Sequence, residues 1–218
     1  MLIAVIDDGI VPELFSIGAL YCDMTVAESG RVRKRKLSER IVTYHGTMVS
    51  GIIKKYAPDV EFCSIRIFSG GIMKATCIQL IAALEWCLKA EIPVVNLSLG
   101  TTDPDDFDDV RRIVDRLLRQ GQTVVAAAKN NGDYTLPAFH AGVLGVKADA
   151  SLIDNQIRIN PDKHGVPLLA SSRHKLVLPD NSTIFTQISN SYAAPTVTAR
   201  VCLLRQTDNG VNLNRLIC

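Results

Sequence analysis

The sequence has no apolar run long enough to cross a bilayer and almost no excess charge of either sign. Its 218 residues carry 24 Lys and Arg against 22 Asp and Glu, whereas a spanning helix needs about 20 consecutive apolar residues. A net charge of +2 gives no general attraction to nucleic acid or to an anionic membrane. We therefore expect neither a membrane nor a nucleic acid as a partner.

Cysteine motifs typical of zinc sites or redox centres are also missing. The six Cys form no CxxC pair and no zinc-like pattern with the four His. Residues 1–9 lack the basic region of a secretory signal, and their apolar run ends in two acids. We therefore expect reduced thiols, no metal site and a cytoplasmic location. The cysteines are Cys22, Cys63, Cys77, Cys87, Cys202 and Cys218.

Apolar residues, in contrast, are abundant. Hydrophobic side chains make up 47% of the sequence, which excludes disordered, collagen-like and coiled-coil proteins. The length suits a single core, and neither an internal repeat nor a linker interrupts it. We expect one compact domain over residues 1–218.

Short, strand-like apolar runs alternate with helical periodicity along most of the chain. Helices are predicted over residues 76–90 and 103–120, and strands over residues 2–6, 60–68, 93–99, 123–128 and 143–148. This alternation predicts an α/β fold in three layers, with a mainly parallel twisted sheet and helices on both faces. Catalytic groups of such sheets gather at the carboxyl ends of the strands.

Two segments break this alternation. Residues 22–40 are polar, and residues 31–36 carry five positive charges. We interpret this basic run as a solvated, mobile loop rather than a nucleic-acid site, because no aromatic platform or recognition motif accompanies it. Residues 149–189 contain several short runs and turn residues, which predict irregular chain or small antiparallel hairpins.

Polar residues stand at four places that could bear chemistry. Asp7 ends the first predicted strand, and Asn130 follows the strand over residues 123–128. His45 stands where a helix can begin, and Ser191 lies near the start of a helix predicted to run to about residue 204. Each also has a plain interpretation: turn residues for Asp7 and Asn130, a surface or core His45, and a helix-capping Ser191.

Taken together and in order, these segments resemble the motifs of the subtilisin-like serine peptidases, or subtilases. The resemblance runs from residue 2 to about residue 199 and keeps the chain order Asp, His, Ser. The matching segments are VIDDG (5–9) with VIDTG, HGTMVSGII (45–53) with HGTHVAGII, NLSLG (96–100) with NMSLG, AAAKNNG (126–132) with AAAGNxG, LPA (136–138) with YPA, and SYAAP (191–195) with SMAAP.

The resemblance implies a serine endopeptidase. With the cytoplasmic location expected above, it would process peptides or proteins inside the cell. Asp7, His45 and Ser191 would form its catalytic triad, and Asn130 would donate a hydrogen bond to the oxyanion. A peptide substrate would lie extended along one wall of the cleft. The expected substrate-binding residues are Ser98, Leu99, Gly100, Ala128 and Lys129.

Several positions depart from the family pattern. Asp8 replaces Thr or Ser, and is either solvated or gives the local site a preference for positive charge. Lys129 replaces a Gly near the base of the specificity pocket, and either selects an acidic residue before the scissile bond or points outward. Ser189 and Asn190 replace Gly-Thr before the nucleophile, where Gly permits an unusual backbone conformation. This last change threatens activity most. Met48 and Thr196 replace two further His residues.

The sequence also bears on processing segments, cofactors and an alternative function. Because the first strand begins at once, we expect no signal peptide and no N-terminal prodomain. No cofactor is expected; calcium, which is common in the family, stays open as a ligand because its sites cannot be assigned here. The acids of residues 103–109 suit a helix start better than a calcium loop. The alternative function is a binding or scaffold protein of the same fold that has lost turnover, and the oligomeric state stays open.

Overall fold

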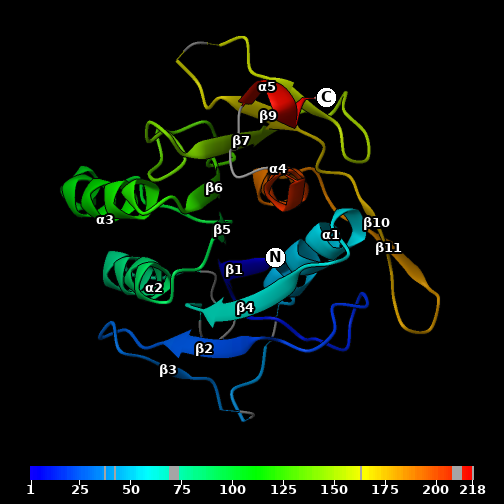
Figure 1. Ribbon diagram of the computed structural model, residues 1–218, viewed down its shortest axis with the longest axis horizontal. Helices are drawn as coiled ribbons and strands as arrows, with labels where there is room; N and C mark the ends of the chain where they lie inside the picture. Colours follow the sequence, from blue (N-terminus) through cyan, green and yellow to red (C-terminus); the bar gives the residue numbers. More distant parts are fainter. Residues whose placement is uncertain (37, 42, 69–73, 163, 208–212, 218) are drawn as a thin grey trace.

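The protein is built around one twisted sheet. The computed structural model describes residues 1–36, 38–41, 43–68, 74–162, 164–207 and 213–217. The strands of the sheet are β1 (Leu2–Asp7), β2 (Cys22–Val26), β3 (Val32–Lys34), β4 (Glu61–Arg66), β5 (Val94–Leu97), β6 (Thr123–Ala127), β7 (Leu144–Ala148), β8 (Ile157–Ile159) and β9 (Leu168–Ala170). Within the described residues their order is β3-β2-β4-β1-β5-β6-β7-β9-β8. Neighbours pair in parallel except at the edges, where β3 and β8 are antiparallel (Figure 1).

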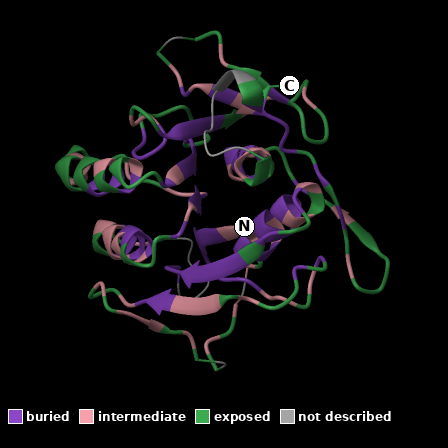
Figure 2. Ribbon diagram, viewed as in Figure 1, coloured by how far each residue is buried: buried purple, intermediate pink, exposed green. Residues whose placement is uncertain are grey.

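Helices cover both faces of this sheet. On one face α1 (His45–Tyr56) packs against α4 (Asn190–Thr207), and on the other α2 (Cys77–Lys89) packs against α3 (Phe107–Arg119). Because successive strand side chains point to opposite faces, Ile3 lies in the core with α1 and α4, whereas Ala4 lies in the core with α2 and α3. Burial on both faces, visible in Figure 2, explains the uninterrupted apolar run of β1. The predicted three-layer α/β fold is confirmed.

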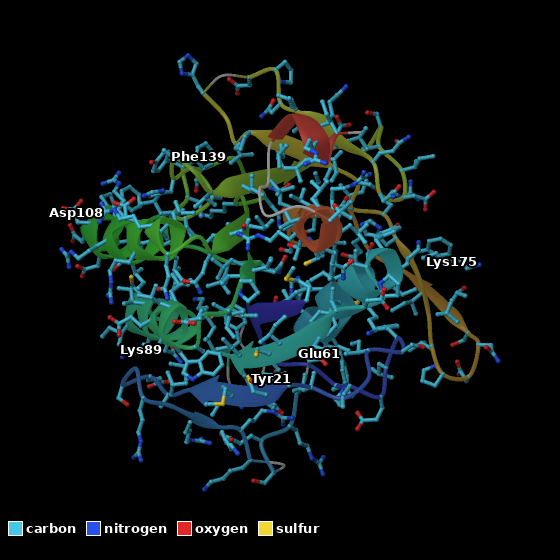
Figure 3. The ribbon with its side chains drawn as sticks, in the orientation of Figure 1. Tyr21, Glu61, Lys89, Asp108, Phe139 and Lys175 are labelled. Carbon is cyan, nitrogen blue, oxygen red and sulfur yellow. The ribbon has the colours of Figure 1, made fainter. Side chains whose placement is uncertain are left out.

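The helix boundaries follow from local chemistry. Thr76 and Gln79 form a capping box at the start of α2. The predicted helix over residues 103–120 begins with a 3₁₀ turn, η1 (Pro104–Asp106), before α3 starts. Figure 3 labels Lys89 in the last turn of α2 and Asp108 in the first turn of α3, where each charge complements the helix dipole.

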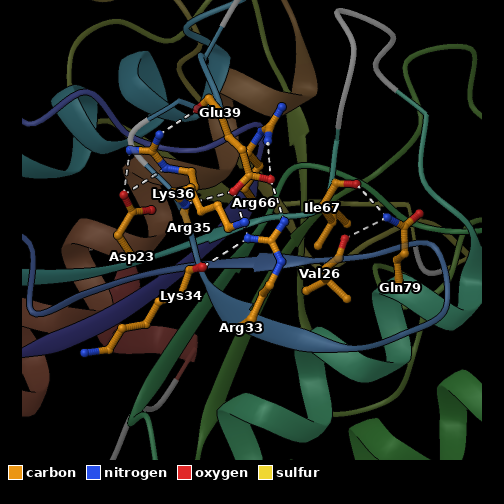
Figure 4. Close-up of polar contacts among 10 residues, drawn as sticks. All are labelled: Asp23, Val26, Arg33, Lys34, Arg35, Lys36, Glu39, Arg66, Ile67 and Gln79. Atoms are coloured by element: carbon orange, nitrogen blue, oxygen red, sulfur yellow. Dashed lines mark hydrogen bonds and ion pairs between the residues drawn. The ribbon is translucent and has the colours of Figure 1, made fainter.

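The basic run of residues 31–36 is not the solvated loop that the sequence predicted. Its first half is β3, which pairs with β2. Arg33 donates to both carboxylate oxygens of Glu39, at 2.6 and 2.8 Å, and Arg35 Nη2 lies 2.6 Å from the carboxylate of Asp23 (Figure 4). The prediction was wrong because the partner acids lie outside the run, and only the folded hairpin brings them alongside.

Residues 149–189 contain the small antiparallel pairs that the sequence predicted. β8 pairs with β9, and β10 (Lys175–Val177) pairs with β11 (Thr183–Phe185) in a separate hairpin. β9 also runs parallel to β7, so part of this segment extends the main sheet. A short helix, α5 (Leu213–Leu216), lies near the end of the chain.

The five cysteines in the described part of the chain are free thiols, and Cys218 lies outside the described residues. None of the helices described is both long and apolar enough to cross a membrane.

Candidate active site

The fold brings Asp7 and His45 into direct contact. Asp7 is the last residue of β1, and His45 is the first residue of α1. The Nδ1 atom of His45 lies 2.9 Å from each carboxylate oxygen of Asp7. The chain places β4 on one side of β1 and β5 on the other, and such a reversal opens a crevice at the carboxyl end of the central strand. The contact therefore lies where an α/β sheet binds its ligands.

This contact sets the charge preference of His45. Asp7 is completely buried, whereas the His45 side chain keeps 18% of its surface exposed. Burial disfavours the charged imidazole, but the charge of Asp7, its hydrogen bond and the charge of Asp8 together raise the pKa of His45 above its usual value. The pair thus favours an imidazole that can accept a proton and be stabilised as the cation.

Ser191 lies at the start of α4, next to a residue that contacts the same imidazole. It is the second residue of that helix, and the ring of its neighbour Tyr192 lies 5.0 Å from the ring of His45, centroid to centroid. Among the described residues no hydrogen bond joins the Ser191 hydroxyl to His45. Catalytic hydrogen bonds are often long or poorly aligned without substrate. The structure therefore brings the three elements together without closing the Ser–His bond.

Asn130 contacts the segment that precedes Ser191. Its side-chain oxygen accepts the backbone N–H of Asn190 at 2.9 Å, and its Nδ2 lies 3.4 Å from Ser189 Oγ. Because the oxygen is occupied by Asn190, the orientation of the amide is set and Nδ2 remains the donor for a ligand. Asn130 and Ser191 line the same cavity.

Asn190, which the sequence predicted only as a threat to activity, holds three backbone segments together. Its side chain is buried, donates to the backbone oxygens of Ala128 at 3.0 Å and Lys129 at 3.2 Å, and accepts the N–H of Ala148 at 2.8 Å. Ser189 is absent from the described non-glycine residues with positive φ, so the loss of Gly strains no left-handed position there. No local spacing links residue 190 to these partners, so the sequence held no signal for this contact.

A cavity of about 530 Å³ adjoins Ser191. It is lined by all five residues that the resemblance assigned to substrate binding: Ser98, Leu99, Gly100, Ala128 and Lys129. Sequence reasoning missed the other lining residues, which are Phe68, Lys74, Ala75, Thr102, Ala127 and Thr135. Several of these come from segments without a recognisable motif, so only the fold could place them.

The cleft wall at Gly100 requires glycine. A Cβ atom at this position would lie 2.3 Å from the backbone oxygen of Leu136, because Thr101 and Leu136 pair through two backbone hydrogen bonds. Lys129 also lines this cavity, but its Nζ lies 2.6 Å from the carboxylate of Asp133, and both side chains are more than two-fifths exposed. The ammonium group is therefore already paired, which favours the outward orientation considered from the sequence.

A second histidine lies beside the first turn of α4. His174 is completely buried; its Nδ1 lies 3.0 Å from the Tyr56 hydroxyl, and its Nε2 lies 3.1 Å from the backbone oxygen of Tyr192 and 3.2 Å from that of Ser171. Burial is the main cause that lowers the pKa of His174, to about 4. A neutral imidazole thus ties α1 to the first turn of α4. In the described part of the chain, no three His, Cys, Asp or Glu side chains are arranged to hold a metal ion.

Proteins of known family are similar to this chain in sequence. The model of the subtilase family matches residues 1–154. The minor extracellular protease Epr of Bacillus subtilis (strain 168) is 26% identical over 223 residues, which cover 94% of this chain and 32% of that protein. The chain therefore spans about a third of this relative's length.

Solved structures share the fold. An epidermin leader peptide processing serine protease from Staphylococcus aureus superposes with a TM-score of 0.69 at 18% identity, covering 94% of this chain and 64% of that one. The prenylagaramide maturation protease PagA gives a TM-score of 0.66 at 20% identity, covering 95% of this chain and 76% of that one.

Proposed function

Because the chain belongs to the subtilase family, we propose that it is a serine endopeptidase in which Ser191 attacks the peptide bond, His45 is the general base and Asp7 orients His45. The observation that carries this proposal is the 2.9 Å contact between His45 Nδ1 and the buried carboxylate of Asp7. A proton held on Nδ1 by Asp7 leaves Nε2 free to accept the proton of the Ser191 hydroxyl.

The proposed reaction proceeds through an acyl-enzyme. Ser191 Oγ attacks the carbonyl carbon of the scissile peptide bond while His45 Nε2 takes the proton of the Ser191 hydroxyl. His45 then returns that proton to the leaving amine. The oxyanion would accept hydrogen bonds from Asn130 Nδ2 and from the backbone N–H of Ser191. In the free protein this N–H lies 3.3 Å from Ser189 Oγ, so the oxyanion would replace that acceptor. A water molecule activated by His45 then releases the acid product.

The substrate that we propose is an extended segment of a precursor peptide. The cavity beside Ser191 is open along residues 98–100 and has room for side chains of the substrate. Two structures that share this fold carry names that refer to leader peptide processing and to maturation. We extend that class of substrate to this chain, and propose that it acts in the cytoplasm, as the sequence led us to expect.

A fluorophosphonate probe tests the proposal directly. We expect the wild-type protein to be labelled at Ser191, as mapped by mass spectrometry, and labelling to disappear in Ser191→Ala. Labelling should fall by about 10³-fold or more in His45→Ala, because the triad acts as a unit. The exposed Ser151→Ala variant is the matched control and should be labelled normally.

Substrate cleavage provides the complementary measurement. A diverse peptide library incubated with the protein should show cut sites that vanish in Ser191→Ala. A wild-type protein that is folded by circular dichroism, yet neither labelled nor able to cut any peptide, would support the binding or scaffold alternative instead.

A further inference from the structure

Asp8 places a second carboxylate next to the proposed triad, and the fold buries it. Only 5% of its surface is exposed, so the solvated side chain considered from the sequence is wrong. Its own backbone N–H donates to Asp7 Oδ1 at 2.9 Å. Among the described residues no Lys or Arg forms an ion pair with Asp8. A buried carboxylate without a cation needs hydrogen-bond donors.

Those donors come from the first turn of α1. Asp8 Oδ1 accepts the backbone N–H of Gly46 at 2.7 Å, and Oδ2 accepts the backbone N–H of His45 at 3.2 Å together with the hydroxyl of Thr43. The first N–H groups of a helix have no partner within the helix. Tyr44, which precedes the helix, has φ 56° and its side chain accepts no capping hydrogen bond. Asp8, the residue that follows β1, therefore caps α1.

Close packing holds this arrangement in place. A Cβ atom on Gly46 would lie 2.7 Å from the backbone oxygen of Gly9, 2.9 Å from Asp7 Cβ and 3.1 Å from Asp8 Oδ1. The start of α1 thus rests directly on the end of β1, and only glycine permits this approach. The turn that bears His45 is held by packing and by the Asp8 carboxylate together.

We propose that Asp8 is a positioning residue of the active site, whose carboxylate caps α1 and thereby sets the place and the electrostatic environment of His45. The inference rests on the proposed function for its catalytic meaning. A carboxylate at a helix N-terminus is also stabilised by the helix dipole, so the cap can remain charged while buried.

The charged neighbours agree with this role. Asp7 and Asp8 both raise the pKa of His45, which opposes the effect of its burial. Burial and the charge of Asp7 raise the pKa of Asp8, while its hydrogen bonds with Thr43, Gly46 and His45 lower it. From α4, burial and the two acids raise the pKa of Tyr192 to about 12, so this ring stays neutral. The imidazolium formed during catalysis would thus be stabilised by two carboxylates.

The test compares Asp8→Asn with Asp8→Ala. Asn keeps a side-chain oxygen for one N–H of α1 but removes the charge, whereas Ala removes both. We expect a downward shift of the His45 pKa, followed by NMR titration of the ring protons, in both variants. The melting temperature should fall by about 2–4 °C in Asp8→Ala, and the rate of fluorophosphonate labelling should fall by about 10–100-fold. Asp8→Asn should lie between Asp8→Ala and the wild type.

The matched control is Asp180→Asn, which removes the same charge at the exposed tip of the β10–β11 hairpin and should leave the His45 pKa unchanged. An unchanged His45 pKa in folded Asp8→Asn protein would overturn the inference, whatever happens to the melting temperature. The titration requires no turnover. A protein that is never labelled but shows the shift would keep the role of Asp8 and reject the peptidase.

Discussion

Acid should destabilise this protein through His174. The imidazole has no exposed surface, and its two nitrogens lie within hydrogen-bond distance of Tyr56 and of the backbone oxygens of Ser171 and Tyr192. Its Nε2 faces the carbonyl groups and therefore carries the proton, whereas Nδ1 accepts the Tyr56 hydroxyl. A second proton would place a positive charge in the core. Burial opposes that charge most strongly and Lys55 opposes it further, which together outweigh the backbone oxygens of Tyr192 and Ser171 and the charge of Asp154 that favour it.

The size of the effect follows from the two pKa values of His174. In the unfolded chain the pKa is about 6.5, and in the folded protein burial lowers it to about 4. Between these values the unfolded chain binds a proton that the folded protein does not. Stability is therefore complete above pH 6.5 and falls as the pH drops toward 4, by about 1.4 kcal/mol per pH unit. The full loss is about 3 kcal/mol.

Urea unfolding of the wild type and of His174→Gln measures this loss. Gln does not titrate. Between pH 7 and pH 4.5, the free energy of unfolding of His174→Gln should therefore fall by about 2–3 kcal/mol less than that of the wild type. His164→Gln, at an exposed histidine, should behave like the wild type. Equal losses for wild type and His174→Gln would show that the reasoning is wrong, even if His174→Gln is less stable at every pH.

Three further predictions concern other parts of the molecule. Asn130→Leu should lower kcat about 10²–10³-fold with little change in KM, because the amide acts on the oxyanion. The measurement uses a peptide that the wild type cuts, and a rise in KM with unchanged kcat would contradict this role. Glu39→Gln should lower the free energy of unfolding at pH 7 by no more than about 1 kcal/mol, because its pair with Arg33 is partly exposed. Arg33 and the N–H of Lys36 lower the pKa of Glu39 from about 4.5 to about 2. The greater stability of the wild type over Glu39→Gln should therefore disappear as the pH falls through this range. A difference in the free energy of urea unfolding that stays constant with pH would refute the prediction. Matched peptides with Glu, Leu or Lys before the scissile bond should show no preference for Glu, since Lys129 is paired with Asp133; a strong preference for Glu would contradict this.

The sequence by itself predicted the three layers and the alternation of strands and helices that builds them. The run Leu2–Asp7 is apolar at every residue but its last, which only a strand buried on both faces explains. Two other features are equally local: the capping box of α2 and the buried apolar face of α3, which consists of Val110, Ile113, Val114 and Leu117. Local patterns of this kind are visible in the sequence because each is decided within a few residues. The family motifs added the candidate residues Asp7, His45 and Ser191.

Only the tertiary structure decided which side chains meet. His45 and Asp7 are 38 residues apart and Asn190 and Asn130 are 60 apart, and neither pair follows from any period of a helix or strand. The same is true of Asp8, whose capping role depends on β1 ending next to the start of α1. It is also true of Glu39, which pairs with Arg33 in a run that otherwise suggests a free basic loop. A pattern of apolar residues specifies the face that an element buries, but it does not specify its partner across the core. That choice is made by packing and hydrogen bonding between distant segments.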